Sequence, residues 1–250
     1  QAMLIEALGI ESLFLAIGPG MGGMQALQWA SAYPKRVFAC VTVAAAAKQA
    51  AHNIALAELG RQAIMADPDW RNGAYLQHGV RPARGNAVAR TSAQLAGLSE
   101  QDVRSRFESA RTQERFAFSA EGANDPMRPQ QGAGFIDRFD ANSYLYLSRA
   151  MDGFDLAADF GGRLANAFQG GATRHGVFSF SSDWRYSPDE GRQIARALAA
   201  AGAEASFLEI TSAHGHDAYL GHEPAFEAAL TGFIDSAAAA RGLALNGGGA

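Results

Sequence analysis

The chain has 250 residues, of which 48% are hydrophobic and 18% are charged, and its formal net charge at pH 7 is −4. This length and composition suit one globular domain, or a domain with an added lid, and exclude a disordered chain. The small negative charge argues against nucleic acid as a partner, and no apolar stretch is long enough to span a membrane. Cys40 is the only cysteine, which excludes an internal disulfide. With no signal sequence in view, we expect a cytoplasmic protein.

The chain begins with a predicted helix over residues 2–9, followed by a short strand and the glycine-rich turn 18–23. The turn satisfies G-x-G-x-x-G, which is the fingerprint of dinucleotide binding. In that fold the next strand should be followed by an acidic residue, but the strand predicted at 37–43 leads into Ala44–Ala47. Pro19 also removes a backbone N–H from a loop that should present N–H groups to phosphate. The dinucleotide interpretation is therefore the weaker one.

The same turn has the context of a nucleophile elbow, G-x-Ser-x-G, in which a strand turns sharply into a helix. Gly20 stands where the serine should be, and the following helix ends before Tyr33-Pro34. This elbow is typical of the α/β-hydrolase fold. A tight strand-to-helix turn without chemistry is the alternative. Because several strands normally precede the elbow in this fold, we expect the chain to be N-terminally truncated.

The order of the remaining elements predicts an α/β core interrupted by a helical insertion. Residues 1–60 and 169–250 alternate between helices and strands, as in a mostly parallel sheet. Residues 61–168 contain no convincing strand and are predicted to form a helical lid. The expected elements after residue 60 are helices at 87–95 and 100–115, a polar loop at 121–134, a strand at 176–180, a helix from Ser187 to 201, a strand at 205–210 and a helix at 225–239.

Two polar residues follow the last two predicted strands in the order that a catalytic triad requires. Asp183 comes after the strand at 176–180, and His216 comes after the strand at 205–210. In the α/β-hydrolase order, nucleophile, acid and histidine each lie beyond a strand's carboxyl end. The acid orients the imidazole, which moves the proton, and the backbone N–H of Met21 would contribute to an oxyanion hole. Gly20 has no hydroxyl group, so acyl-enzyme chemistry is excluded for the chain as written.

These residues resemble the homoserine O-acetyltransferases of methionine biosynthesis, a family with the α/β-hydrolase fold. The matching stretches occur in the family's order along nearly the whole chain; they are 22–29 with Tyr33-Pro34, Asn53 with 60–64 and Asp67-Pro68, 138–145, Ser182-Asp183-Trp184 and 215–218. The resemblance implies a helical lid used for homodimerisation. It also implies transfer of an acetyl group from acetyl-CoA, as co-substrate, to the hydroxyl group of homoserine.

The resemblance also implies roles for individual residues. Asp183 and His216 match the family's acid and base, Arg90 resembles the arginine that pairs with the substrate carboxylate, and Asp217 resembles the residue that receives the substrate ammonium. An exposed helix charge is the alternative for Arg90. Besides Gly20 in place of the nucleophile, Gly97 stands where the family usually has a lid tyrosine, which puts homoserine recognition in question.

Two other functions remain open on the same fold. An opened lid at Gly97 would favour water as the acyl acceptor and give an acyl-ester hydrolase. A non-catalytic pseudoenzyme or partner subunit is the other alternative. We expect no metal site, because His214, His216 and Asp217 lack the helical spacing of a zinc pair. We also expect no bound cofactor.

Overall fold

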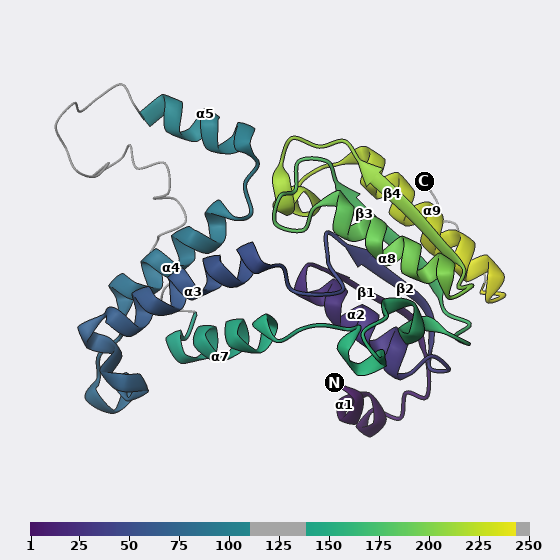
Figure 1. Cartoon of the computed structure of the whole chain (residues 1–250), viewed down its shortest axis with the longest axis horizontal. Coiled ribbons are helices and arrows are strands. Elements are labelled where there is room, and N and C mark those ends of the chain that lie inside the picture. Colours follow the sequence, from purple (N-terminus) through teal and green to yellow (C-terminus); the bar gives the residue numbers. More distant parts are fainter. Residues whose placement is uncertain (111–138, 244–250) are drawn as a thin grey trace. The chain divides into compact units, whose positions relative to one another are not determined.

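The computed structural model describes residues 1–110 and 139–243, so the polar loop predicted at 121–134 and the end of the helix predicted at 100–115 lie outside the described residues (Figure 1). The chain divides into two compact units. Unit 1 contains Gln1–Lys48, Asp155–Ser212 and Asp217–Ala250, and unit 2 contains Gln49–Phe154 with Ala213–His216. The division of the chain into a core of 1–60 with 169–250 and a lid of 61–168 stays a prediction.

Unit 1 is built on a parallel sheet. Its four strands are β1 (Leu13–Pro19), β2 (Val37–Val43), β3 (Arg174–Phe180) and β4 (Ala205–Ile210). They lie in the order β1-β2-β3-β4, and every neighbouring pair is parallel. The predicted parallel α/β architecture is therefore confirmed. Because all four strands run in one direction, the segments that follow them leave the same edge of the sheet.

Helices cover both faces of this sheet (Figure 1). They are α2 (Met21–Ala32) and α8 (Pro188–Ala200) on one face and α9 (Pro224–Ala240) on the other. Ser179 faces α8, because a Cβ added at Gly191 of that helix would meet its side chain. The next side chain along β3 has the opposite direction, so Phe178 packs against Phe226 of α9 with 5.8 Å between ring centroids. The α9 face carries a core of aromatic and aliphatic side chains.

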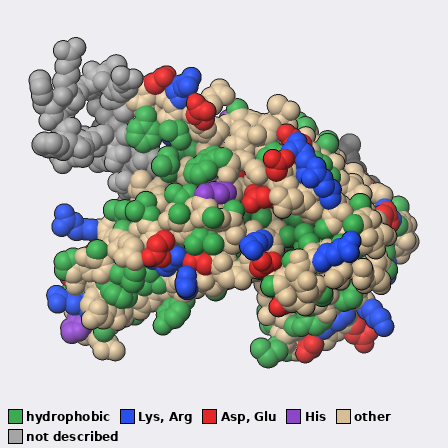
Figure 2. Space-filling view, in the orientation of Figure 1, with side chains coloured by type: hydrophobic (Ala, Val, Ile, Leu, Met, Phe, Trp, Pro, Cys, Tyr) green, Lys and Arg blue, Asp and Glu red, His purple; other side chains and the backbone are tan. Residues whose placement is uncertain are grey.

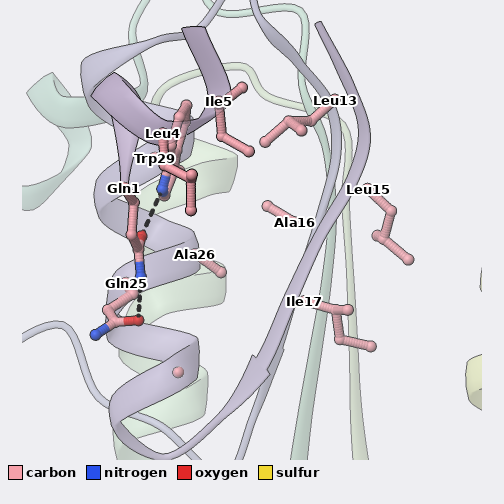
Figure 3. Close-up of a pocket in the computed structure, with 11 residues that line it drawn as sticks. Gln1, Leu4, Ile5, Leu13, Leu15, Ala16, Ile17, Gln25, Ala26 and Trp29 are labelled. Atoms are coloured by element: carbon pink, nitrogen blue, oxygen red, sulfur yellow. Dashed lines mark hydrogen bonds between the residues drawn. The ribbon is translucent and has the colours of Figure 1, made fainter. Parts of the chain in front are cut away.

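The free edge of β1 borders a groove that the short helix α1 (Ala2–Ala7) closes on one side (Figure 3). The groove has a volume of about 340 Å³ and is lined mainly by apolar side chains of α1, β1 and α2. Gln1 fixes α1 to α2, since it donates to Gln25 Oε1 and accepts from Trp29 Nε1, each at 2.8 Å. Ile17 of β1 remains 46% exposed.

The described part of unit 2 is helical. Its α-helices are α3 (Ala51–Ala66), α4 (Ala83–Leu95), α5 (Glu100–Ala110) and α7 (Ala141–Asp152), with short 3₁₀ helices at Pro68–Gly73 and Tyr75–His78. Gly85 lets α4 approach α3, because a Cβ there would lie 2.6 Å from Ala63 O. The buried Arg61 of α3 reaches α7, where its Nη2 donates to Asp152 Oδ2 at 2.7 Å.

Candidate active site

Gly20 forms a sharp turn between β1 and α2 in a conformation that would be strained for any residue with a Cβ. Its backbone angles are φ 51° and ψ −118°, which lie outside the regions that L-residues populate. Its N–H donates to Val43 O at 2.9 Å, and its carbonyl accepts from Met24 N–H at 3.1 Å. The turn is thus held by the sheet on one side and by the first helical hydrogen bond on the other. The predicted strand–turn–helix is confirmed, and Gly20 is its apex.

Close packing around the turn explains why the neighbouring residues are glycines. A Cβ on Gly18 would collide with the backbone of Gly22, and a Cβ on Gly23 would lie 2.6 Å from Ala45 Cβ. The start of α2 therefore lies directly against the ends of β1 and β2. Met21 is the first residue of α2, and the first N–H groups of a helix have no intrahelical acceptor. Such groups can donate to an oxyanion, as predicted for Met21.

Asp183 is buried, with 2% of its surface exposed, three residues beyond the end of β3. Its Oδ1 accepts hydrogen bonds from the backbone N–H groups of Arg185 and Tyr186, each at 2.9 Å. Its own N–H donates to Phe180 O at 3.1 Å. These bonds fix the carboxylate relative to β3, which is what an acid that orients a histidine needs.

Tyr219 links the segments that follow β3 and β4 within unit 1. Its pKa is raised by burial and, to a smaller extent, by the negative charges of Asp217 and Asp183. The two carboxylates therefore lie within electrostatic reach of one phenol. Asp217 is exposed. Tyr219 was not among the predicted site residues, because no motif in the sequence points to it.

His216 is also buried, with 5% of its surface exposed, in the 3₁₀ helix Gly215–Leu220. The boundary between the two units falls inside this helix, since Ala213–His216 belongs to unit 2 and Asp217 to unit 1. Gly215 has a φ of +64°, and a Cβ there would lie 2.6 Å from the backbone nitrogen of Ser99. The segment that carries His216 therefore packs against residues 97–99 of unit 2.

Arg90 lies on α4 in unit 2, where it is half-buried. Its role as the arginine that pairs with a substrate carboxylate, against that of a helix charge, stays a prediction. Gly97 follows the same helix, and its N–H donates to Gln94 O at 2.9 Å. Gln94 adds a second polar group to α4, because its Oε1 is buried and has no hydrogen-bond partner among the described residues.

The structure thus places Gly20, Met21, Asp183 and Asp217 in unit 1, and Arg90 and His216 in unit 2. The first group follows β1, β3 and β4 at the carboxyl edge of one sheet, where ligands bind in open α/β folds. That His216 and Arg90 join this group in one active site stays a prediction.

The structure also bears on four other functions: thiol catalysis, nucleic-acid binding, metal binding and membrane insertion. Burial raises the pKa of the Cys40 thiol to about 12, so it is not a nucleophile near neutral pH. On the face shown in Figure 2, acidic and basic side chains of the described residues are interspersed. Among the described residues, no three metal-ligating side chains lie together so that they could hold an ion. Within the same residues, no helix combines the length and hydrophobicity needed to cross a membrane.

Comparison with known proteins identifies the class to which this chain belongs. The family model for the alpha/beta hydrolase fold matches residues 1–223. The chain belongs to this family. This excludes the dinucleotide interpretation of the glycine-rich turn and agrees with the strained geometry at Gly20.

The chain is a homologue of proteins named homoserine O-acetyltransferase. It is 54% identical over 246 residues to the one from Caulobacter vibrioides (strain NA1000 / CB15N), a match that covers 97% of this chain and 64% of the relative. The protein of the same name from Mesorhizobium japonicum is 52% identical over 247 residues, with 97% and 63% covered. The chain therefore spans slightly less than two thirds of these relatives.

Two solved structures share the fold. Homoserine O-acetyltransferase from Bacillus anthracis superposes with a TM-score of 0.76 at 23% identity, covering 87% of this chain and 58% of that one. Esterase E22 superposes with a TM-score of 0.78 at 24% identity, covering 94% and 64%. At these identities the likeness establishes the fold alone.

Proposed function

We propose that this chain is the larger part of a homoserine O-acetyltransferase, by descent an enzyme that transfers an acetyl group from acetyl-CoA to L-homoserine. The observation that carries the proposal is the identity of 54% over 97% of the chain to a protein of that name. The strained turn at Gly20 and the buried Asp183 and His216 support it, because they are the parts that acyl transfer requires.

In the proposed reaction a serine at position 20 attacks the acetyl thioester while His216 removes the hydroxyl proton. Asp183, held by two backbone N–H groups, orients the imidazole and stabilises its protonated form. The N–H of Met21 donates to the tetrahedral oxyanion. CoA leaves with the proton from His216, and the homoserine hydroxyl then takes the acetyl group by the same steps in reverse.

Gly20 interrupts this sequence at its first step, because no oxygen is available to attack the thioester. Removal of the nucleophile from a serine hydrolase lowers turnover by roughly 10⁶-fold. We therefore infer that the chain as written is inactive or severely impaired in acetyl transfer. The sharp strand-to-helix turn at Gly20, which is typical of a nucleophile elbow, supports the descent from an active enzyme.

Arg90 and Asp217 are proposed to bind the two charged groups of homoserine. A guanidinium fork pairs with a carboxylate through two parallel hydrogen bonds, and Asp217 offers a carboxylate to the ammonium. Gly97 lacks the tyrosine side chain that the family usually has at this place in the lid, and this favours water as a second acyl acceptor. The second candidate function is accordingly an acyl-ester hydrolase.

The deciding experiment restores the serine. Gly20→Ser is prepared in a chimaera that supplies the residues of the Caulobacter vibrioides relative lying outside the match, with Gly20→Ala as the control for the added Cβ. The serine variant should release CoA from acetyl-CoA only when homoserine is present, and the alanine variant should not. Release without homoserine would indicate a hydrolase. Calorimetry that detects no binding of acetyl-CoA, homoserine or O-acetylhomoserine would instead favour a non-catalytic subunit.

We further propose that unit 2 mediates homodimerisation. Apolar side chains of α7 face solvent in the single chain, with Tyr146 79% exposed and Leu147 53% exposed. Sedimentation of the chain should give a dimer, and Tyr146→Asp should give a monomer with unchanged helicity. A monomer in both cases would remove this proposal.

A further inference from the structure

We propose that the turn at residues 97–102 in unit 2 is the element that positions His216, and that Gly215 and Asp102 are its positioning residues. The proposal rests on the role of His216 as the base in the proposed function. In this proposal residues of unit 2 hold the base in position, whereas the carboxylate of Asp183 is held by backbone N–H groups of unit 1.

The first support is the close backbone approach at Gly215, the residue before His216. A Cβ there would lie 2.6 Å from Ser99 N, 2.7 Å from Gly97 O and 2.7 Å from the carbonyl carbon of Leu98. All three atoms belong to backbone, which cannot move aside as a flexible side chain can. The left-handed φ of +64° imposes glycine at the same position. Two independent constraints therefore require glycine at position 215, and one of them, the close approach, places the segment directly against the turn.

The second support is that the turn is buried and is held by hydrogen bonds of its own. Leu98 and Ser99 are buried, with 6% and 2% of their surfaces exposed. Ser99 caps α5, since its Oγ accepts from Asp102 N–H at 2.9 Å and donates to Asp102 Oδ2 at 3.0 Å. This reciprocal pair satisfies an N–H at the helix start that would otherwise lack an acceptor. Ser99 and Asp102 stand three positions apart in the sequence, which is the spacing of such a cap.

The third support is a contact between Asp102 and His214, the residue two positions before His216. Asp102 Oδ1 lies 3.7 Å from His214 Nδ1, so one carboxylate holds the helix cap with one oxygen and faces His214 with the other. Residues 214 and 215 thus both contact the 97–102 turn, directly before His216. A displacement of this turn should therefore displace the imidazole of His216.

The first test separates the contact from backbone strain. Gly215→Ala adds backbone strain and also a collision of the new Cβ with the backbone of residues 97–99. Gly79→Ala adds backbone strain alone, because Gly79 has a φ of +65° and no atom lies within 4 Å of an added Cβ. In Gly215→Ala the amide of Asp102 should exchange with solvent roughly tenfold faster, and the His216 imidazole signal, assigned by its loss in His216→Gln, should move. Gly79→Ala should change neither. Equal behaviour of the two variants would overturn the proposal.

A second pair of variants keeps the test decisive if Gly215→Ala does not fold. Asp102→Asn removes the charge that faces His214, and Glu100→Gln makes the same change on the exposed side of α5. Only Asp102→Asn should move the His216 signal, and no movement would count against the proposal. In the Gly20→Ser chimaera, Asp102→Asn should lower kcat about tenfold with an unchanged KM for homoserine. Should the chimaera prove inactive, the proposed function fails, while the imidazole signal still decides the positioning proposal.

Discussion

Replacing Gly20 tests the geometry of the elbow directly. Its φ of 51° and ψ of −118° are strained for any residue with a Cβ, and such strain costs about 1–3 kcal/mol. Replacing glycine by alanine also restricts the unfolded chain, which stabilises the folded protein by about 0.4–1 kcal/mol. The balance predicts that Gly20→Ala and Gly20→Ser each lower the free energy of unfolding by about 1–2 kcal/mol.

Urea unfolding of both variants measures this loss, with Gly22→Ala as the control. Gly22 lies two residues further along, inside α2, and an added Cβ there would touch only Pro19 Cδ, at 3.5 Å. Alanine favours a helix by about 1 kcal/mol over glycine, so this control should be neutral or stabilised. If Gly20→Ala is also neutral or stabilised, the turn is relaxed and the elbow argument is wrong.

Three further predictions concern the framework around the site. Burial lowers the pKa of His175 to about 4 from 6.5, so the unfolded chain binds more protons between these values. The free energy of unfolding should therefore fall by about 3 kcal/mol as the pH drops from 6.5 to 4. Urea unfolding of His175→Phe at several pH values should lack this decrease. If the free energies of the variant and the parent chain change in parallel with pH, the prediction is wrong. Asp152→Ala leaves the buried Arg61 without its α7 carboxylate and should cost about 3 kcal/mol in thermal or urea unfolding, whereas a loss below about 1 kcal/mol would mean that the pair is solvated. Gly18→Ala drives a Cβ into the backbone of Gly22 and should cost about 1–3 kcal/mol; a stable variant with an unaltered far-ultraviolet spectrum would contradict that close approach.

The local elements of unit 1 were predictable because their signals lie within a few residues. Short apolar runs predicted the strands at 176–180 and 205–210, which the structure extends to Arg174–Phe180 and confirms at Ala205–Ile210. The helix predicted from Ser187 begins there as α8, and a capping box holds its start, with Ser187 N–H donating to Glu190 Oε2 at 2.7 Å. The glycines of the elbow signalled a tight turn, since only glycine allows the approach that its backbone makes.

Contacts between distant residues were not predictable in this way. Arg61 and Asp152 are 91 positions apart, and nothing near either residue indicates the other. The influence of Asp183 and Asp217 on Tyr219 likewise depends on how two loops are brought together by the sheet.

The sequence by itself determined the fold class, the turn at Gly20 and the order of Asp183 and His216 along the chain, because each depends on local spacing or on strand order. Only the tertiary structure decided that Ala213–His216 leaves the sheet unit and packs against the turn at 97–102. That outcome depends on a backbone approach between segments more than a hundred residues apart, and spacing along a chain carries no information about such an approach.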